Sequence, residues 1–220
     1  MYRILILLLL CGIKSMQLLQ AQTMSSVFVS MPQEFTVYLD GGLKHDLLAL
    51  WDDKRQAVVT NLMNGRSTLN DFSDDYFFLQ ATESSSFEAC LLPVNDSTKI
   101  VCLISTVYSP TADSRLAFYT TRWQKLNVED YIALPQLDDF LKQHITLPEG
   151  KQVADYFDAL FVHYSFDRQQ GLLKARLSSL DYMIENKQVD EMIAQKELYF
   201  RWDGKFHREV KTVNDDPDKK

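Results

Sequence analysis

Strand-like segments separated by short turn-forming stretches fill the middle of the chain, and this pattern constrains the fold more than any other feature. The segments are rich in aromatic and β-branched residues, and the connectors hold Ser, Asn, Asp and Pro, which favour turns. The expected strands are residues 76–82, 87–94, 100–108 and 116–123. Connectors this short join neighbouring antiparallel strands, so the sequence predicts an antiparallel meander.

Further strands are expected on both sides of this meander. A strand at 58–62 leads to Asn64-Gly65, a pair that tolerates the positive φ angles of a tight hairpin. In the second half, the expected strands are residues 160–166, 172–180, 197–202 and 205–210. The last two would be joined at Asp203-Gly204. The second half therefore repeats the antiparallel pattern of the first.

Short helices are expected around these strands. Ser30 and Pro32 indicate the start of a helix that Asp40-Gly41-Gly42 would end, and Leu43, Leu47, Leu50, Trp51 and Lys54 lie at helical spacing. Two more helices are expected, at residues 135–143 and 187–195. Because helices and strands do not alternate regularly, the predicted fold class is α+β, with antiparallel meander sheets packed by short helices. Residues 100–104 are apolar on both faces, which predicts a central strand covered on both sides.

The first 22 residues have the pattern of a secretory signal peptide. Arg3 precedes an apolar run at 4–13, which is far shorter than the ~20 residues that cross a bilayer. We expect cleavage after Ala21 or Gln22, and therefore export to the periplasm or the exterior. Lipoprotein processing at Cys11 is the alternative, although the preceding Leu10 is not small. No later stretch reaches membrane-spanning length without charges, so the mature chain is expected to have no transmembrane segment.

Residues 23–211 are expected to form one domain, followed by a disordered tail at 212–220. A boundary at 147–151 is the alternative division. The formal charge of −7 becomes −9 without the leader, which leaves 21 basic and 30 acidic side chains. This acidity is spread along the chain and excludes the clustered Lys and Arg of a nucleic-acid surface.

Cys90 and Cys102 remain once the leader and Cys11 are removed. They flank the expected turn at 95–98. A three-residue loop (95–97) places the two cysteines directly opposite each other, whereas a four-residue loop turns them to opposite faces. Either a cross-strand disulfide or two half-buried free thiols fits the sequence, and the free thiols are favoured.

Several stretches resemble a family of exported bacterial proteins catalogued as domain of unknown function 3256 and seen mainly in Gram-negative anaerobes. They are residues 28–32, 91–100, 113–123, 134–140 and 202–206. The resemblance implies a signal peptide and no assigned activity, so it supplies no catalytic residues. In architecture, two helices leading into a meander are also similar to β-lactamase-inhibitor-like and PepSY-like domains, which implies nothing about function.

Signatures of known chemistry are missing from the sequence. The glycines form no phosphate-binding loop and no Gly-x-Ser-x-Gly element, and the histidines (45, 144, 163 and 207) have no metal-ligand spacing. Adjacent acids occur at 52–53, 74–75, 138–139 and 215–216, but neighbours in sequence point in different directions. We therefore predict no catalytic, cofactor-binding or metal-binding residue. A hydrolase that uses acidic residues and His163 is the alternative function.

Three features remain as candidate functional residues. Asp96-Ser97-Thr98 resembles an O-glycosylation acceptor on Ser97, although Asp and Ser are also ordinary turn residues. Tyr199 and Trp202 are the candidate aromatic binding surface, since the last hairpin alternates its aromatic side chains between two faces. The preferred function is a non-enzymatic interaction module of the cell envelope that binds a protein, peptide or glycan. An uncovered edge strand would instead indicate a subunit of a larger assembly.

Overall fold

The computed structural model describes residues 23–140, 160–179 and 197–209. The expected leader, the helix at 187–195, the boundary at 147–151 and the tail at 212–220 lie outside these residues. In chain order the elements are α2 (Met24–Val29), α3 (Gly41–Asp52), β1 (Val58–Thr60), β2 (Arg66–Phe72), β3 (Tyr76–Thr82), β4 (Ser85–Asn95), β5 (Thr98–Tyr108), β6 (Ala112–Thr120), β7 (Lys125–Leu126), the 3-10 helix η1 (Val128–Asp130), α4 (Leu137–Phe140), β8 (Val162–Asp167), β9 (Leu172–Leu177), β10 (Leu198–Trp202) and β11 (Phe206–Glu209).

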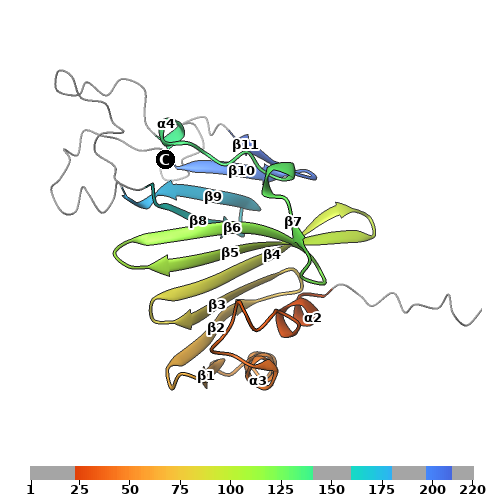
Figure 1. Ribbon diagram of the computed structural model, residues 1–220. Helices are drawn as coiled ribbons and strands as arrows, with labels where there is room; N and C mark the ends of the chain where they lie inside the picture. The colour runs from red at the N-terminus through yellow and green to blue at the C-terminus, as the bar shows by residue number, and fades with distance from the viewer. Residues whose placement is uncertain (1–22, 141–159, 180–196, 210–220) are drawn as a thin grey trace, which may run out of the picture.

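Two antiparallel sheets make up the fold (Figure 1). The large sheet has seven strands in the order β1 to β7, so each strand pairs with its neighbour in sequence. The second sheet has four strands in the order β11-β10-β9-β8. The predicted meander and the predicted α+β class are both confirmed, with sheets dominating the architecture.

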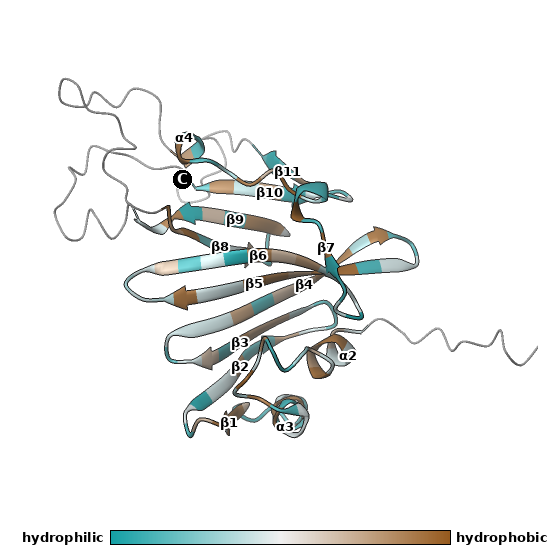
Figure 2. Ribbon diagram, viewed as in Figure 1, coloured by the Kyte–Doolittle hydropathy of each residue, from teal (hydrophilic) through white to brown (hydrophobic). Residues whose placement is uncertain are grey.

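The large sheet separates two hydrophobic cores. Along β5, Val101 and Leu103 point into the core beneath the helices, whereas Cys102 and Ile104 point into the core shared with the second sheet. Figure 2 shows brown and teal residues mixed along most strands, as expected where neighbouring residues face different environments. The central strand is therefore covered on both faces, as its sequence predicts.

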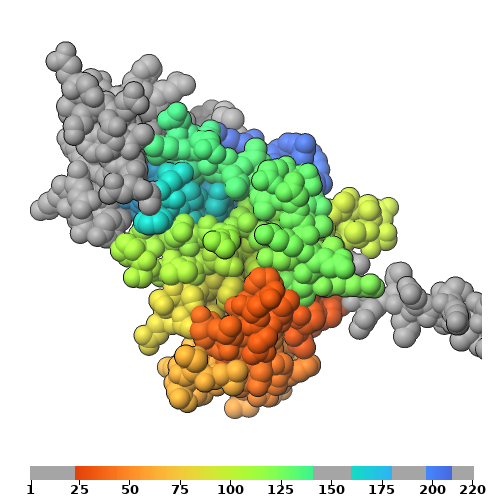
Figure 3. Space-filling model, viewed as in Figure 1, coloured from red at the N-terminus to blue at the C-terminus, as the bar shows by residue number. Residues whose placement is uncertain are grey.

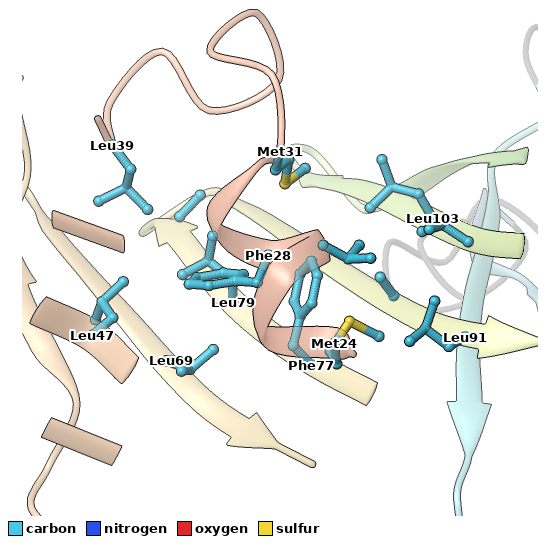
Figure 4. Packing of buried hydrophobic residues seen from close by; sticks show 14 of the residues in the cluster. Met24, Phe28, Met31, Leu39, Leu47, Leu69, Phe77, Leu79, Leu91 and Leu103 are labelled. Carbon is cyan, nitrogen blue, oxygen red and sulfur yellow. The ribbon is translucent and has the colours of Figure 1, made fainter. Parts of the chain in front are cut away.

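The first helix begins earlier than the sequence predicts. Thr23 caps α2 by accepting a hydrogen bond from the Ser26 amide, and Ser30 and Pro32 follow the helix instead of starting it. Met24 and Phe28 of α2 are buried against the large sheet, close to Phe77 (Figure 4). The predicted helix at 30–40 is thus wrong: Ser30 is the C-cap of α2, and the residues after it form turns closed by the Phe35–Pro32 and Leu39–Thr36 backbone hydrogen bonds.

The second helix is confirmed, but its start and its buried face differ from the prediction. Asp40 does not end a preceding helix; its carboxylate accepts a hydrogen bond from the Leu43 amide and caps α3. Leu47 is fully buried, whereas Lys54 is exposed beyond the end of the helix. Lys44 is only 2% exposed, and its Nζ donates to the Met31 carbonyl at 2.6 Å. This contact ties the loop after α2 to α3.

The outer strands of the second sheet are covered. The Tyr164 and Phe166 amides of β8 donate to the Ser114 hydroxyl (3.1 Å) and the Glu88 carboxylate (2.9 Å) of the large sheet. On β11, the Phe206 amide donates to the Tyr131 carbonyl at 2.7 Å. Among the described residues, the edges left uncovered by these contacts are the short strands β1 and β7. β1 pairs with three residues of β2, and β7 pairs with two residues of β6.

The described helices are short. Among the residues that the structure describes, no helix has both the length and the apolar character needed to cross a membrane.

Candidate functional site

The described acids and histidines do not converge on one site. Adjacent acids lie at the end of α3 (52–53), in the β2–β3 turn (74–75) and on α4 (138–139), while 215–216 and His144 lie outside the described residues. Within the described ranges, no group of three His, Cys, Asp or Glu residues could hold a metal ion. His163 lies on β8 with its ring edge-on to Tyr108 at 6.3 Å. The convergence that a hydrolase would require is not found in this part of the chain.

The acid whose surroundings are most unusual is Glu88, which sequence analysis did not single out. It lies on β4 with 8% of its surface exposed, on the side that faces β8. Its Oε1 accepts hydrogen bonds from the Tyr76 hydroxyl at 2.7 Å and from the Phe166 amide at 2.9 Å. Arg168 lies over the Tyr76 ring, 4.5 Å from its centre, and forms an ion pair with Asp71. The cluster joins three neighbouring strands of the large sheet to the end of β8.

Burial shifts the pKa of two groups in this cluster. Burial raises the pKa of Glu88, and the hydrogen bonds from Phe166 and Tyr76 offset this rise only in part. Burial and the neighbouring Glu88 together raise the pKa of Tyr76 well above its ordinary value. The Glu88 carboxyl is 8% exposed and bonded to a phenol and a backbone amide inside a sheet interface, so it leaves little room for a substrate. The cluster holds the two sheets together.

Cys90 and Cys102 are directly opposite each other on β4 and β5. This is the register predicted for a three-residue loop, but it arises differently. The turn holds two residues between Asn95 and Thr98, and an irregularity between Pro93 and Asn95 absorbs the extra one. Both thiols are free in the structure. The choice between a disulfide and two packed free thiols stays a prediction.

We expect both thiols of a chain spanning residues 23–220 to be unreactive in the folded protein at neutral pH. Burial raises the pKa of Cys90 to about 12 and that of Cys102 well above its ordinary value, so thiolate is scarce. A colorimetric thiol reagent should detect two thiols after denaturation without reductant and none before it. An exposed Lys54→Cys variant is the positive control for the native reaction. Finding no thiol after denaturation would instead demonstrate the disulfide.

Ser97 lies at the tip of the β4–β5 hairpin, which projects from the body of the molecule (Figures 1 and 3). Both its amide and its hydroxyl donate to the Asn95 side-chain oxygen, at 3.0 Å and 3.2 Å. The residue is exposed and has the contacts of an ordinary turn residue. O-glycosylation of Ser97 therefore stays a prediction from the sequence.

Tyr199 and Trp202, the candidate aromatic binding residues, lie on the two faces of the last hairpin, as the sequence predicts; a binding role for them stays a prediction. They lie on opposite faces of β10, and both are half-buried. The Trp202 indole donates to the Pro93 carbonyl at 2.8 Å and stacks on Tyr131 at 6.1 Å. The Tyr199 hydroxyl donates to Glu197 at 2.6 Å. The Trp202 ring therefore packs between elements, whereas the contact of Tyr199 is with a neighbour on its own strand end.

A different surface carries exposed apolar side chains. Met63 is 72% exposed, and Val37 and Leu62 are each 52% exposed. The Leu62 amide donates to the Tyr38 carbonyl at 2.8 Å, so the loop after β1 lies against the loop before α3. We call Val37, Leu62 and Met63 the loop surface. Large apolar residues are often exposed singly, but these three lie on adjoining loops, which makes the loop surface a candidate docking site.

Asn61 holds the loop surface in place. Its side-chain oxygen accepts hydrogen bonds from the Met63 and Gly65 amides, both at 3.0 Å. Its side-chain nitrogen donates to the Ser67 hydroxyl at 3.1 Å and to the Ala81 carbonyl at 3.4 Å. Asn61 is only 4% exposed, so a buried and fully bonded amide fixes the loop that exposes Leu62 and Met63.

The sequence contains partial signals for these two sites. Asn64-Gly65 correctly predicts the hairpin, and Asn64 has a positive φ of 60°. The same turn places Leu62 and Met63 outside the sheet, a consequence that hydropathy alone does not reveal. Glu88 lies between Phe87 and Ala89 in a strand, where an acid is usually exposed to solvent. Nothing local indicates that β8 covers it.

Comparison with known proteins agrees with the resemblance found in the sequence. A family model described as a protein of unknown function, DUF3256, matches residues 16–207. The chain belongs to the DUF3256 family. This DUF3256 match spans both sheets, including Glu88 and the loop surface. No curated protein matches the chain.

One solved structure has a similar fold over nearly its whole length. It is described as the structure of a domain of an uncharacterized protein from Porphyromonas gingivalis W83, and it aligns with a TM-score of 0.68 at 20% identity. The alignment covers 83% of this DUF3256 chain and 97% of that chain. At this identity the likeness concerns the fold alone.

Proposed function

We propose that this protein is an exported, non-enzymatic interaction module that docks a partner protein through the loop surface. The observation that carries the proposal is the gathering of three large, exposed apolar side chains on two loops joined by a backbone hydrogen bond. Export is proposed from the sequence of residues 1–22, with its basic start and short apolar run.

The construction of the loop supports docking. A flexible loop loses conformational entropy when it binds, whereas a loop already fixed by internal hydrogen bonds loses less. Asn61 provides four such bonds, and the Leu62 amide adds a fifth to the neighbouring loop. Met63 is flexible and polarizable, so it adapts to the shape of an apolar partner. The loop surface therefore combines a fixed backbone with an adaptable apolar contact.

The kind of partner is inferred from the side chains of the loop surface that face solvent. Val37, Leu62 and Met63 are aliphatic and offer area for a protein or peptide, but no flat aromatic platform for a sugar ring. Among the partners considered from the sequence, a protein fits best. The contacts of Tyr199 and Trp202 with Glu197 and Pro93 make the glycan alternative less favourable.

Site-specific photo-crosslinking in living cells of the native organism tests this proposal. A photoreactive phenylalanine analogue at position 63 is expected to give a discrete adduct containing one other protein, identified by mass spectrometry. The matched control is position 74, an exposed residue in the β2–β3 turn at the opposite end of β2. Equal adducts at positions 63 and 74, no adduct at 63, or an adduct made only of two copies of this chain would each contradict the proposal.

A further inference from the structure

A carboxyl group buried between two sheets usually has a role in the packing or in the chemistry, and Glu88 has no suitable site for chemistry. Its position nevertheless requires a hydrogen-bond acceptor. It is 8% exposed, yet it supplies the acceptor for an outward amide of β8, the outer strand of the second sheet. Ser114 bonds the Tyr164 amide on the same strand, but through a neutral hydroxyl. Glu88 is thus the ionisable member of this pair of contacts.

The hydrogen bonds of Glu88 are compatible with a neutral carboxylic acid. The Tyr76 hydroxyl and the Phe166 amide both donate to Oε1. In a protonated carboxyl, the carbonyl oxygen accepts hydrogen bonds while the other oxygen carries the proton. Oε1 is the oxygen that accepts hydrogen bonds. Among the hydrogen bonds of the described residues none involves Oε2, so this oxygen can carry the proton. The geometry therefore accommodates the proton without breaking either bond.

The groups that face Glu88 do not compensate a negative charge well. They are Asp71 on β2, Tyr76 on β3, Cys90 on β4, Cys102 on β5, the Phe166 amide on β8 and Arg168 after β8. Arg168 is the cation among them, and its guanidinium is already paired with Asp71 and bonded to Ser73. Asp71 acts on Glu88 in the direction that disfavours ionisation. An ionised Glu88 would thus be buried among mainly neutral groups.

We propose that protonation of Glu88 controls the attachment of β8 to the large sheet. As a neutral acid, Glu88 holds the end of β8 against β4. When Glu88 loses its proton, the end of β8 separates from β4 and water enters. The other contacts between the sheets do not involve the Glu88 carboxyl; they include the Tyr164–Ser114 hydrogen bond and an apolar core with Phe118, Leu173 and Phe200. The change is therefore local to the end of β8 and its turn.

The direction of the pH effect follows from linkage. Burial raises the pKa of Glu88 in the folded protein above its value in the unfolded chain. The stabilisation from the neutral acid is fully present below the unfolded pKa and is lost as the pH rises through the folded pKa. Between these two values, the protection of the Phe166 amide against hydrogen exchange should fall by up to about tenfold per pH unit.

Glu88→Gln provides the test, because glutamine keeps the accepting oxygen and cannot ionise. Amide exchange measured by NMR from about pH 4 to about pH 9 is expected to show the fall in Phe166 protection in the wild type, after correction for intrinsic exchange. The fall should be absent in Glu88→Gln. Glu83→Gln, the same change at an exposed residue of the β3–β4 turn, is the matched control and should behave as the wild type. Parallel pH profiles in wild type and Glu88→Gln would overturn the proposal.

A second measurement needs no variant. The carboxyl carbon of Glu88, followed by NMR in the wild-type protein, is expected to titrate above the ordinary value of 4.5. Titration at or below that value would overturn the proposal, even if Glu88→Gln failed to fold.

Discussion

Replacing Asn61 with alanine is expected to lower the free energy of unfolding by about 2–4 kcal/mol, because several buried hydrogen bonds are lost together. The Met63 and Gly65 amides lose their acceptor, and the Ala81 carbonyl and Ser67 hydroxyl lose a donor. Part of this loss is recovered, since the Ser67 hydroxyl still donates to the Ala81 carbonyl at 2.6 Å. The Met63 and Gly65 amides have no second acceptor among these contacts, so the loop should open.

Denaturant unfolding followed by circular dichroism measures this effect. Asn70→Ala is the control, since Asn70 is an exposed asparagine on the neighbouring β2 and should change stability by no more than about 0.5 kcal/mol. We also expect the photo-crosslink at position 63 to disappear in Asn61→Ala under conditions where the protein stays folded. If Asn61→Ala were as stable as Asn70→Ala, the loop would not depend on this side chain.

Replacing Trp123 with alanine is expected to lower the free energy of unfolding by about 2–4 kcal/mol through lost aromatic packing. The indole nitrogen donates to the Val27 carbonyl at the end of α2, at 3.1 Å. Its ring packs on Phe35 at 5.7 Å and on Tyr119 at 5.5 Å. Trp123 therefore fastens α2 and the loop after it to β6, and alanine removes all three contacts.

The backbone of Trp123 adds a second, separable effect. Its φ is 62°, a conformation that favours glycine, in the tight β6–β7 turn where its amide donates to the Thr120 carbonyl at 2.9 Å. Trp123→Gly loses the same ring as Trp123→Ala but removes the strain, so it should be more stable than the alanine variant by about 1 kcal/mol. Circular dichroism is the suitable probe, because tryptophan fluorescence changes with the substitution itself. Equal stabilities for the two variants would mean that the turn holds no strain.

The strand order of the large sheet was predictable because its information is local. Each strand pairs with the next along the chain, and turn residues mark most of the boundaries between them. β3 occupies the predicted residues, and β5 is buried on both faces as its composition indicates. Asn64-Gly65 and Asp203-Gly204 likewise marked real hairpins, since each pair suits the backbone of a tight turn.

Errors arose where two local signals competed. Ser30 and Pro32 have the spacing of a helix start, but Ser30 instead ends α2, which Thr23 caps and which Met24 and Phe28 anchor in the core. Asp40 before two glycines indicated a helix end, although an aspartate also caps a following helix. The sequence alone does not show whether such a residue begins a helix or ends one when both positions fit.

The Glu88 cluster and the loop surface could not be predicted for a different reason. Glu88 is buried by a strand 78 residues further along the chain, and no property of its own neighbourhood indicates that contact. Leu62 is the last residue of the strand expected at 58–62, but β1 ends at Thr60, so Leu62 and Met63 lie in the loop. Their exposure depends on Asn61, whose four hydrogen bonds exist only in the folded loop.

The neighbour-to-neighbour order of the large sheet has a consequence for how the chain acquires its structure during synthesis. Pairings between adjacent strands close short loops and form quickly, so residues 58–126 can assemble as they emerge. The bonds that attach the second sheet span 50 residues (Tyr164 to Ser114), 78 residues (Phe166 to Glu88) and 109 residues (Trp202 to Pro93). Until β8 arrives, one face of the nascent large sheet is exposed and needs protection from aggregation.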